Sequence, residues 1–230
     1  MGMEASLLKG ACKDLEDYYS NASECEKIII EHACIAGAGG LIPFPIASLV
    51  VIVCSTYSMF VRIFAKLGIQ LKNNIGKTIV SYMTTCLIGN LGAAVIYFLV
   101  PIAADLIKTL PGIGTIIGWI AGPVSDAIVV YVYGYIFLKT ITKICKSGKD
   151  ISEESIKETI AETAKDSKID IHNTVKEAKT VFKHTDFNEY KAKAETMYEE
   201  NKDKCINCGE QVDNSVDVCP NCHKNPRKIE

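Results

Sequence analysis

Three long, almost uncharged stretches dominate the pattern of hydrophobic and polar positions along the chain. They cover residues 33–61, 78–104 and 110–138, and Asp126 is the one charged residue among them. Each stretch is long enough to cross the roughly 30 Å of a bilayer's hydrocarbon core as a helix. The pattern therefore predicts an all-α fold built around a membrane-embedded helical bundle.

Glycine and proline interrupt two of these apolar runs. Pro43 and Pro45 lie too close together for a helix to pass through them, so we expect a helix from about Ile46 to Ala65 after the break. Irregular backbone persists in lipid where protein covers it, so the first run forms either a simple span or a re-entrant hairpin. The candidate helix-break residues are Pro43, Pro45, Pro111, Gly112 and Gly114.

More polar sequence with sparse apolar positions flanks the apolar runs on both sides. From Met3 to Glu31 the apolar positions recur every three or four residues, which predicts one amphipathic helix. From Lys146 to Lys204 lysine alternates with acidic residues, and the same spacing recurs. We expect solvated amphipathic helices there, which pack on each other or on a symmetry-related copy.

The distribution of charge is uneven although its sum is close to zero. The 230 residues contain 25 Lys and Arg and 27 Asp and Glu, but residues 33–138 carry seven of these charges. This distribution disfavours a disordered chain and a uniform globular enzyme. It also gives no reason to expect nucleic acid as a partner, because acidic residues match or outnumber basic ones in the tail.

Clusters of basic residues indicate an orientation in the membrane. Residues 62–77 contain four basic and no acidic residues, and four lysines follow the third run between Lys139 and Lys149. The positive-inside rule places both clusters, and with them the C-terminal tail, in the cytosol. The side of the N-terminus stays open, since a full first span leaves Met1 outside and a hairpin keeps it inside.

Four of the ten cysteines form two CxxC pairs, Cys205 with Cys208 and Cys219 with Cys222. Four soft thiolates on two tight turns suit tetrahedral zinc and require a reducing compartment. The segment resembles the short zinc-ribbon family found in many prokaryotic membrane proteins, although His223 replaces the glycine usual after the second pair. A closed four-thiolate site implies a structural rather than a catalytic metal.

The zinc pattern completes a predicted division of the chain into four parts. These are an N-terminal amphipathic helix (1–32), an apolar membrane domain (33–145), a charged cytosolic helical linker (146–204) and a zinc ribbon (205–230).

Polar residues within the apolar runs are candidate functional residues, because ionisable groups at membrane depth are costly and usually face a cavity or a partner. Asp126 either lines a cation-attracting pore or accepts a helix-cap hydrogen bond at a break. Asp105 lies beside a predicted turn, which favours an interfacial position, and Asn90 is placed to hydrogen-bond across helices.

The order of glycine and proline motifs in residues 30–145 carries a second resemblance. Its elements are the segment from Ala36 to Ala47, the helix end at Phe64–Gly68, the Leu110–Gly114 turn and Tyr131–Gly134. This order resembles the YcjF-type helical membrane domain that follows GTP-binding domains in many bacterial proteins. The resemblance implies a partnership with a GTPase, which would act in trans because this chain contains no P-loop motif.

Catalytic motifs are missing from the sequence: its four histidines are scattered, and no Ser-His-Asp or HExxH arrangement is visible. The leading hypothesis is a channel or membrane-perturbing effector controlled through its cytosolic tail. Two or three crossings cannot enclose a pore, so this hypothesis requires a homo-oligomer in the lipid bilayer. The alternatives are a membrane adaptor of a GTPase and a soluble helical binding module.

Overall fold

The computed structural model describes residues 6–44, 46–69, 114–150, 152–166, 168–205, 208–213 and 216–226. Asn90, Asp105, Pro45, Pro111 and Gly112 lie outside the described residues, as does the whole second apolar run. The prediction of an all-α fold is confirmed: in the described ranges the chain is helical, apart from an isolated bridge between Lys204 and Gln211. The helices are α1 (Ser6–Glu16), α2 (Glu24–Gly39), α3 (Ala47–Lys66), α6 (Gly114–Lys146), α7 (Glu153–Asp166), α8 (Lys168–Phe182), the short 3-10 helix η2 (Phe187–Tyr190) and α9 (Lys191–Asn201).

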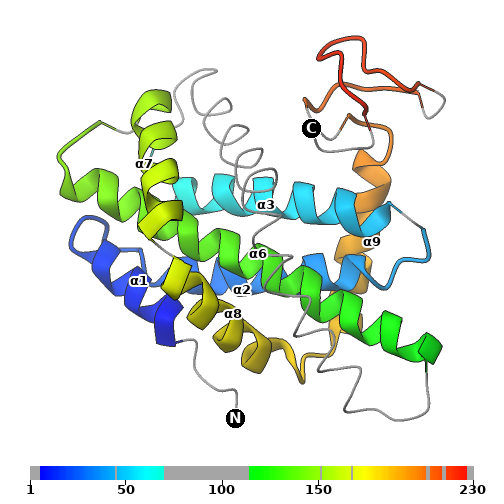
Figure 1. Cartoon of the computed structure of the whole chain (residues 1–230), viewed down its shortest axis with the longest axis horizontal. Coiled ribbons are helices and arrows are strands. Elements are labelled where there is room, and N and C mark those ends of the chain that lie inside the picture. The colour runs from blue at the N-terminus through cyan, green and yellow to red at the C-terminus, as the bar shows by residue number, and fades with distance from the viewer. Residues whose placement is uncertain are drawn as a thin grey trace.

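Three apolar helices, α2, α3 and α6, form the centre of the described fold and contact one another (Figure 1). Glycines allow two of these contacts to be close. A Cβ added at Gly134 of α6 would lie 2.7 Å from the Ile29 side chain of α2, and one at Gly39 would lie 2.8 Å from the Cβ of Val51. The backbones approach so closely because these positions have no side chain.

The turn between α2 and α3 coincides with the first proline. Helix α2 ends at Gly39, Pro43 lies in the turn, and α3 begins at Ala47, one residue after the predicted start. The predicted helix from Ile46 to Ala65 is therefore confirmed to within one residue at each end.

The expectation of a single N-terminal helix from Met3 to Glu31 is wrong. Helix α1 ends at Glu16, and α2 begins at Glu24 and crosses the proposed boundary between residues 32 and 33. The intervening segment, residues 17–23, is rich in Asp, Tyr, Ser and Asn, which have low helix propensity. A turn there lets α1 fold back, so that Leu8 and Leu15 become fully buried.

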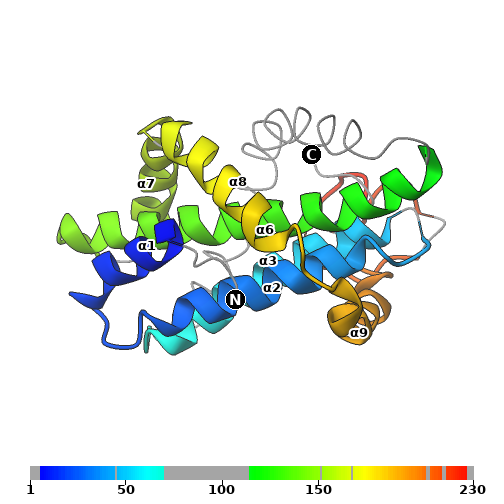
Figure 2. The same cartoon turned by 90° about the horizontal axis from the view of Figure 1, so that it is seen from below.

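The charged helices of the tail pack mainly on the apolar helices, although α7 and α8 also contact each other as the sequence predicted. Helices α7 and α8 contact α6, while α9 contacts α2 and α3 (Figures 1 and 2). Their apolar stripes, represented by Ile156, Val175 and Phe182, are almost fully buried in one core with the apolar helices. The reason is hydrophobic: the largest apolar surface available to each stripe belongs to α2, α3 and α6.

Two described segments are long and apolar enough to cross a membrane, namely α3 and residues 122–146 of α6. They differ in how much protein covers them: 50% of the α3 window is buried inside the chain, against 78% of the α6 window. Core helices of soluble proteins have the same apolar composition as membrane spans. The buried share of each segment therefore distinguishes α3 from residues 122–146 better than the length of the segment does.

Glu177 of α8 joins three helices through its carboxylate. The backbone amide of Leu7 in the first turn of α1 donates to it at 2.9 Å, and the Tyr131 hydroxyl of α6 donates at 2.8 Å. Ser6 Oγ donates a further bond at 2.8 Å. An acidic group at a helix N-terminus satisfies amides that have no partner within the helix.

We expect Glu177→Ala to lower the free energy of unfolding by about 2 kcal/mol, because it removes a charged acceptor shared by α1 and α6. Urea unfolding followed by circular dichroism measures the change. Lys176→Ala, at an exposed position on the same helix, serves as the control and should change stability by less than about 0.5 kcal/mol. Equal effects of the two substitutions would contradict the role of Glu177.

Candidate metal centre

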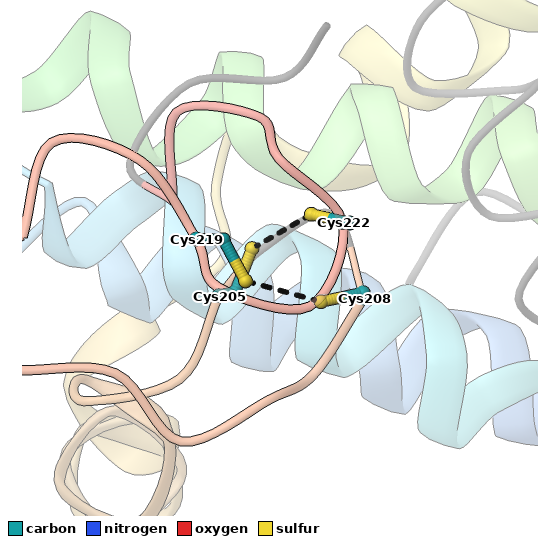
Figure 3. A group of neighbouring side chains, drawn as sticks. All are labelled: Cys205, Cys208, Cys219 and Cys222. Carbon is teal, nitrogen blue, oxygen red and sulfur yellow. Dashed lines mark hydrogen bonds between the residues drawn. The ribbon is translucent and has the colours of Figure 1, made fainter.

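The four C-terminal cysteines come together in space (Figure 3). Their sulfur atoms all lie within 4.8 Å of one another, with 3.7 Å between Cys205 and Cys222 and 3.6 Å between Cys208 and Cys219. A tetrahedron with metal–sulfur bonds of about 2.3 Å has edges of about 3.8 Å. The sulfur positions therefore fit a tetrahedral four-thiolate metal site.

Each cysteine pair occupies a turn with the same backbone hydrogen bonds. In the first turn the Gly209 amide donates to the Cys205 carbonyl at 2.7 Å, and in the second the His223 amide donates to the Cys219 carbonyl at 2.9 Å. In both turns the amide of the first cysteine donates to the carbonyl five residues later. The centre is thus built from two equivalent knuckles, and each presents two sulfur atoms to the same point.

Both knuckles place the residue after the second cysteine in the left-handed region of backbone conformation. Gly209 has φ 77° and His223 has φ 58°, the one non-glycine residue with positive φ in the described ranges. Glycine adopts this conformation freely, whereas a residue with a Cβ is strained by roughly 1–2 kcal/mol. The departure noted in the sequence at His223 therefore affects backbone geometry and leaves the four sulfur atoms in place.

Backbone amides favour the thiolate form of Cys219 in the second knuckle. The amide of Cys222, followed by that of Asn221, lowers the pKa of Cys219 to about 7. Cys205 and Cys219 are buried, and Val212 packs against them in a small core of their own. Metals bind thiolates rather than thiols, so this environment prepares Cys219 for ligation.

The centre is attached to the helical core through α9. The amide of Val212 donates to the Asp203 carbonyl at 2.8 Å, which ties the first knuckle to the residues that follow α9. Within α9, the Tyr198 ring stacks on Phe44 of the α2–α3 turn, with ring centroids 5.7 Å apart. Figure 1 shows the C-terminal loops beyond the end of α9. The knuckles thus follow directly from a helix that is packed on the core.

Asp126, the candidate pore residue, is half-buried between α6 and α3. Its carboxylate accepts a hydrogen bond of 2.5 Å from Ser48 Oγ and therefore joins α6 to α3. A Cβ added at Gly40 would lie 3.0 Å from the same carboxylate oxygen, which places Asp126 close to the α2–α3 turn. The donor to Asp126 is a side-chain hydroxyl and not a helix-terminal backbone amide, so this contact is not the helix-cap bond predicted from the sequence. Ser48 was not predicted as its partner, because the two residues are 78 positions apart in the chain.

A buried histidine forms a second polar cluster, which the sequence analysis missed. The side chain of His32 in α2 contacts Ser55 Oγ at 3.1 Å through Nδ1 and Arg62 at 3.0 Å through Nε2. Arg62 also pairs with Glu31 at 2.9 Å, and Lys193 of α9 pairs with the same carboxylate at 2.6 Å. The cluster therefore links α2, α3 and α9. No local sequence motif predicts this cluster, because its members are spread over the chain.

The hydrogen bonds of this cluster fix the state of His32. Ser55 Oγ donates to the His32 carbonyl at 2.8 Å, so it accepts the Nδ1 proton, and Nε2 accepts from the Arg62 guanidinium. Burial, followed by the charge of Arg62, lowers the pKa of His32 to about 4. The ring is neutral, and because the nitrogen that faces Ser55 already carries its proton, it cannot take the Ser55 proton as a general base would. The pair is structural.

No protein-family model, curated protein or solved structure matches this chain.

The φ angles of the knuckles lead to opposite expectations for two substitutions. Gly209→Ala should weaken zinc binding about tenfold, because alanine is strained at φ 77° while its Cβ meets nothing within 4 Å. His223→Gly should strengthen binding about fivefold, because it relieves the strain at φ 58°. Competition with a chromophoric chelator measures both affinities. Changes of the same sign would contradict this account.

The state of His32 predicts a pH dependence of stability. Its pKa is lowered from 6.5 to about 4 on folding, so the unfolded chain binds more protons between these values. The contribution of His32 is complete above about pH 6.5 and is lost as the pH falls towards 4, by about 2 kcal/mol between pH 7 and pH 5. Urea unfolding at the two pH values measures this loss.

His32→Gln should flatten this part of the pH profile, because glutamine does not titrate. His184→Gln, at an exposed histidine, should leave the profile unchanged. A profile that is identical in the wild type and the His32 variant would exclude His32 as its source.

Proposed function

We propose that the protein is a non-enzymatic, membrane-associated adaptor that holds a zinc-bound pair of knuckles at the end of a helical core for a protein partner. The observation that carries this proposal is the four-cysteine cluster, whose geometry is complete and whose chain leads directly out of the packed helix α9. Zinc suits four sulfur ligands in a tetrahedron and has no redox chemistry of its own. When bound, it would stabilise the knuckles and supply no catalytic position.

We propose that the protein has no catalytic role, because the candidate polar groups among its described residues are already bonded to partners within the chain. The four-sulfur site leaves no ligand position open for a substrate. Ser55 and His32 are buried and bonded to each other and to backbone or Arg62. Among the described residues, the cysteine cluster is the one convergent group of three or more potential metal ligands.

Membrane association is proposed from α3. This helix is apolar over a membrane-spanning length, and protein covers half of it. Uncovered apolar surface of this extent is typical of a site that meets lipid or another protein. The neighbouring basic residues Arg62 and Lys66 would then face anionic headgroups on the cytosolic side.

The adaptor is favoured over the channel by the position of Asp126. A channel at an oligomer axis needs polar side chains directed between copies, whereas Asp126 bonds to Ser48 within one chain. The resemblance of residues 30–145 to YcjF-type domains supports a GTPase as the partner of the adaptor. The proposal includes the formation of such a complex and the nucleotide state in which the GTPase forms it.

Zinc content gives the first test of the proposal. We expect one zinc per chain by native mass spectrometry, with loss of the metal in Cys219→Ser, since three thiolates and a hydroxyl make a poorer site. Cys145→Ser, at a cysteine outside the cluster, is the matched control and should retain one zinc. Full metal content in the Cys219 variant would overturn the assignment of the site.

Vesicle flotation separates the adaptor from the other functions. We expect the full chain to float with phosphatidylcholine–phosphatidylglycerol vesicles and to leave their ion gradients intact. Ion flux would favour the channel, and a chain that stays in the aqueous phase would favour the soluble module. Flotation should survive zinc removal, because α3 rather than the knuckles carries the apolar surface.

A further inference from the structure

Helix α6 is long and apolar enough to span a bilayer, but helices of the same chain cover it. Its candidate span is 78% buried: besides α2 and α3 of the central core, α1, α7 and α8 contact α6 (Figure 2). These three helices turn charged side chains to the outside. The exposed ones include Lys9, Lys13, Asp14, Glu16, Glu154, Glu158, Glu162 and Lys176.

This arrangement is suited to water and unsuited to lipid. Charged side chains in the hydrocarbon region are costly, and a helix alongside a membrane span would place them there. The span and its three covering helices therefore cannot enter a bilayer together. If α6 meets lipid, then α1, α7 and α8 have first left its surface.

Exposed ion pairs connect α1 and α7 to the C-terminal end of α6, whereas α8 is joined to α6 by the hydrogen bond between Tyr131 and Glu177. Lys139 pairs with Asp14 of α1 at 3.7 Å, and Lys143 pairs with Glu162 of α7 at 3.0 Å. Lys149, just after α6, pairs with Glu158 of α7 at 3.0 Å. Such solvated pairs contribute little each and are screened by salt, so they can exchange partners.

The same three lysines are the residues that an anionic membrane surface would attract. Basic residues next to a membrane span bind anionic headgroups, and each contact competes with an acidic side chain for the same ammonium group. Lipid phosphate would thus pair with Lys139, Lys143 and Lys149 in place of Asp14, Glu162 and Glu158.

We propose that α1, α7 and α8 form a releasable cover over α6, and that an anionic membrane surface opens it by replacing the acidic partners of these lysines. The inference rests on the membrane association proposed above and adds the element that enters lipid and the event that allows entry. The covered form is the water-stable state, and the open form exposes α6 to the bilayer.

The chain provides its own probe for this event. Trp119, the one tryptophan of the sequence, lies in α6. Bromine atoms on lipid chains quench tryptophan fluorescence on contact, so quenching reports when the part of α6 just before the candidate span meets the hydrocarbon. The full chain is mixed with brominated vesicles of phosphatidylcholine alone or with added phosphatidylglycerol. We expect quenching with the anionic vesicles and little with the neutral ones.

Substitutions in the cover test the mechanism. Glu158→Gln with Glu162→Gln weakens two pairs to α7 and keeps the lysines, so half-maximal quenching should require about fivefold less anionic lipid. Glu199→Gln, which removes a pair with Lys202 within α9, is the matched control and should not shift the curve. Replacing Lys139, Lys143 and Lys149 by Gln should abolish the preference for anionic vesicles.

Hydrogen exchange on the same samples shows whether the cover opens. Amides of α1, α7 and α8 should lose protection with anionic vesicles while those of α9 keep theirs. Flotation without quenching, or quenching with the cover still protected, overturns the cover and leaves the adaptor intact. A chain that does not float with either vesicle overturns the proposed function itself.

Discussion

The constraint on which the described fold depends is the apolar surface of α6. This helix is nearly uncharged from Gly114 to Leu138, and its side chains are buried from Val130 to Leu138. Helices from both ends of the chain meet on it, α1 from the N-terminus and α7 and α8 from the tail. Burial of this surface explains why segments with so different a composition share one core.

Polar contacts determine which helix covers which part of the core. Glu177 accepts hydrogen bonds from the N-terminus of α1 and from Tyr131 of α6. Both bonds can form in one position of α8 on the core. In the cluster around His32, Glu31 pairs with Lys193 and Arg62, and their hydrogen bonds and charges lower the pKa of Glu31. Hydrophobic burial has little directionality, and these bonds supply the register that it lacks.

The sequence predicted what local chemistry determines. The bounds of α3 followed from two prolines and an apolar run, and the cysteine cluster followed from the spacing of two CxxC pairs. The turn after Glu16 was missed because no proline or glycine marks it, and weak propensities are decided by tertiary contacts. Partners distant in the chain, such as Ser48 for Asp126 or Ser55 for His32, leave no periodic trace.

The charge pattern illustrates the same limit at the scale of the whole chain. Lysines after an apolar run are expected both at the cytosolic end of a membrane span and at the end of a core helix that pairs with acidic neighbours. Lys139 and Lys143 satisfy both descriptions, since they follow the third run and contact Asp14 and Glu162. Composition cannot separate the two cases, because the residues are identical in each. The distinction lies in what occupies the apolar face of α6, and the amphipathic helices on either side of the apolar runs carry stripes that fit it. In the proposed release of α1, α7 and α8, one helix would exchange protein for lipid without a change in any residue.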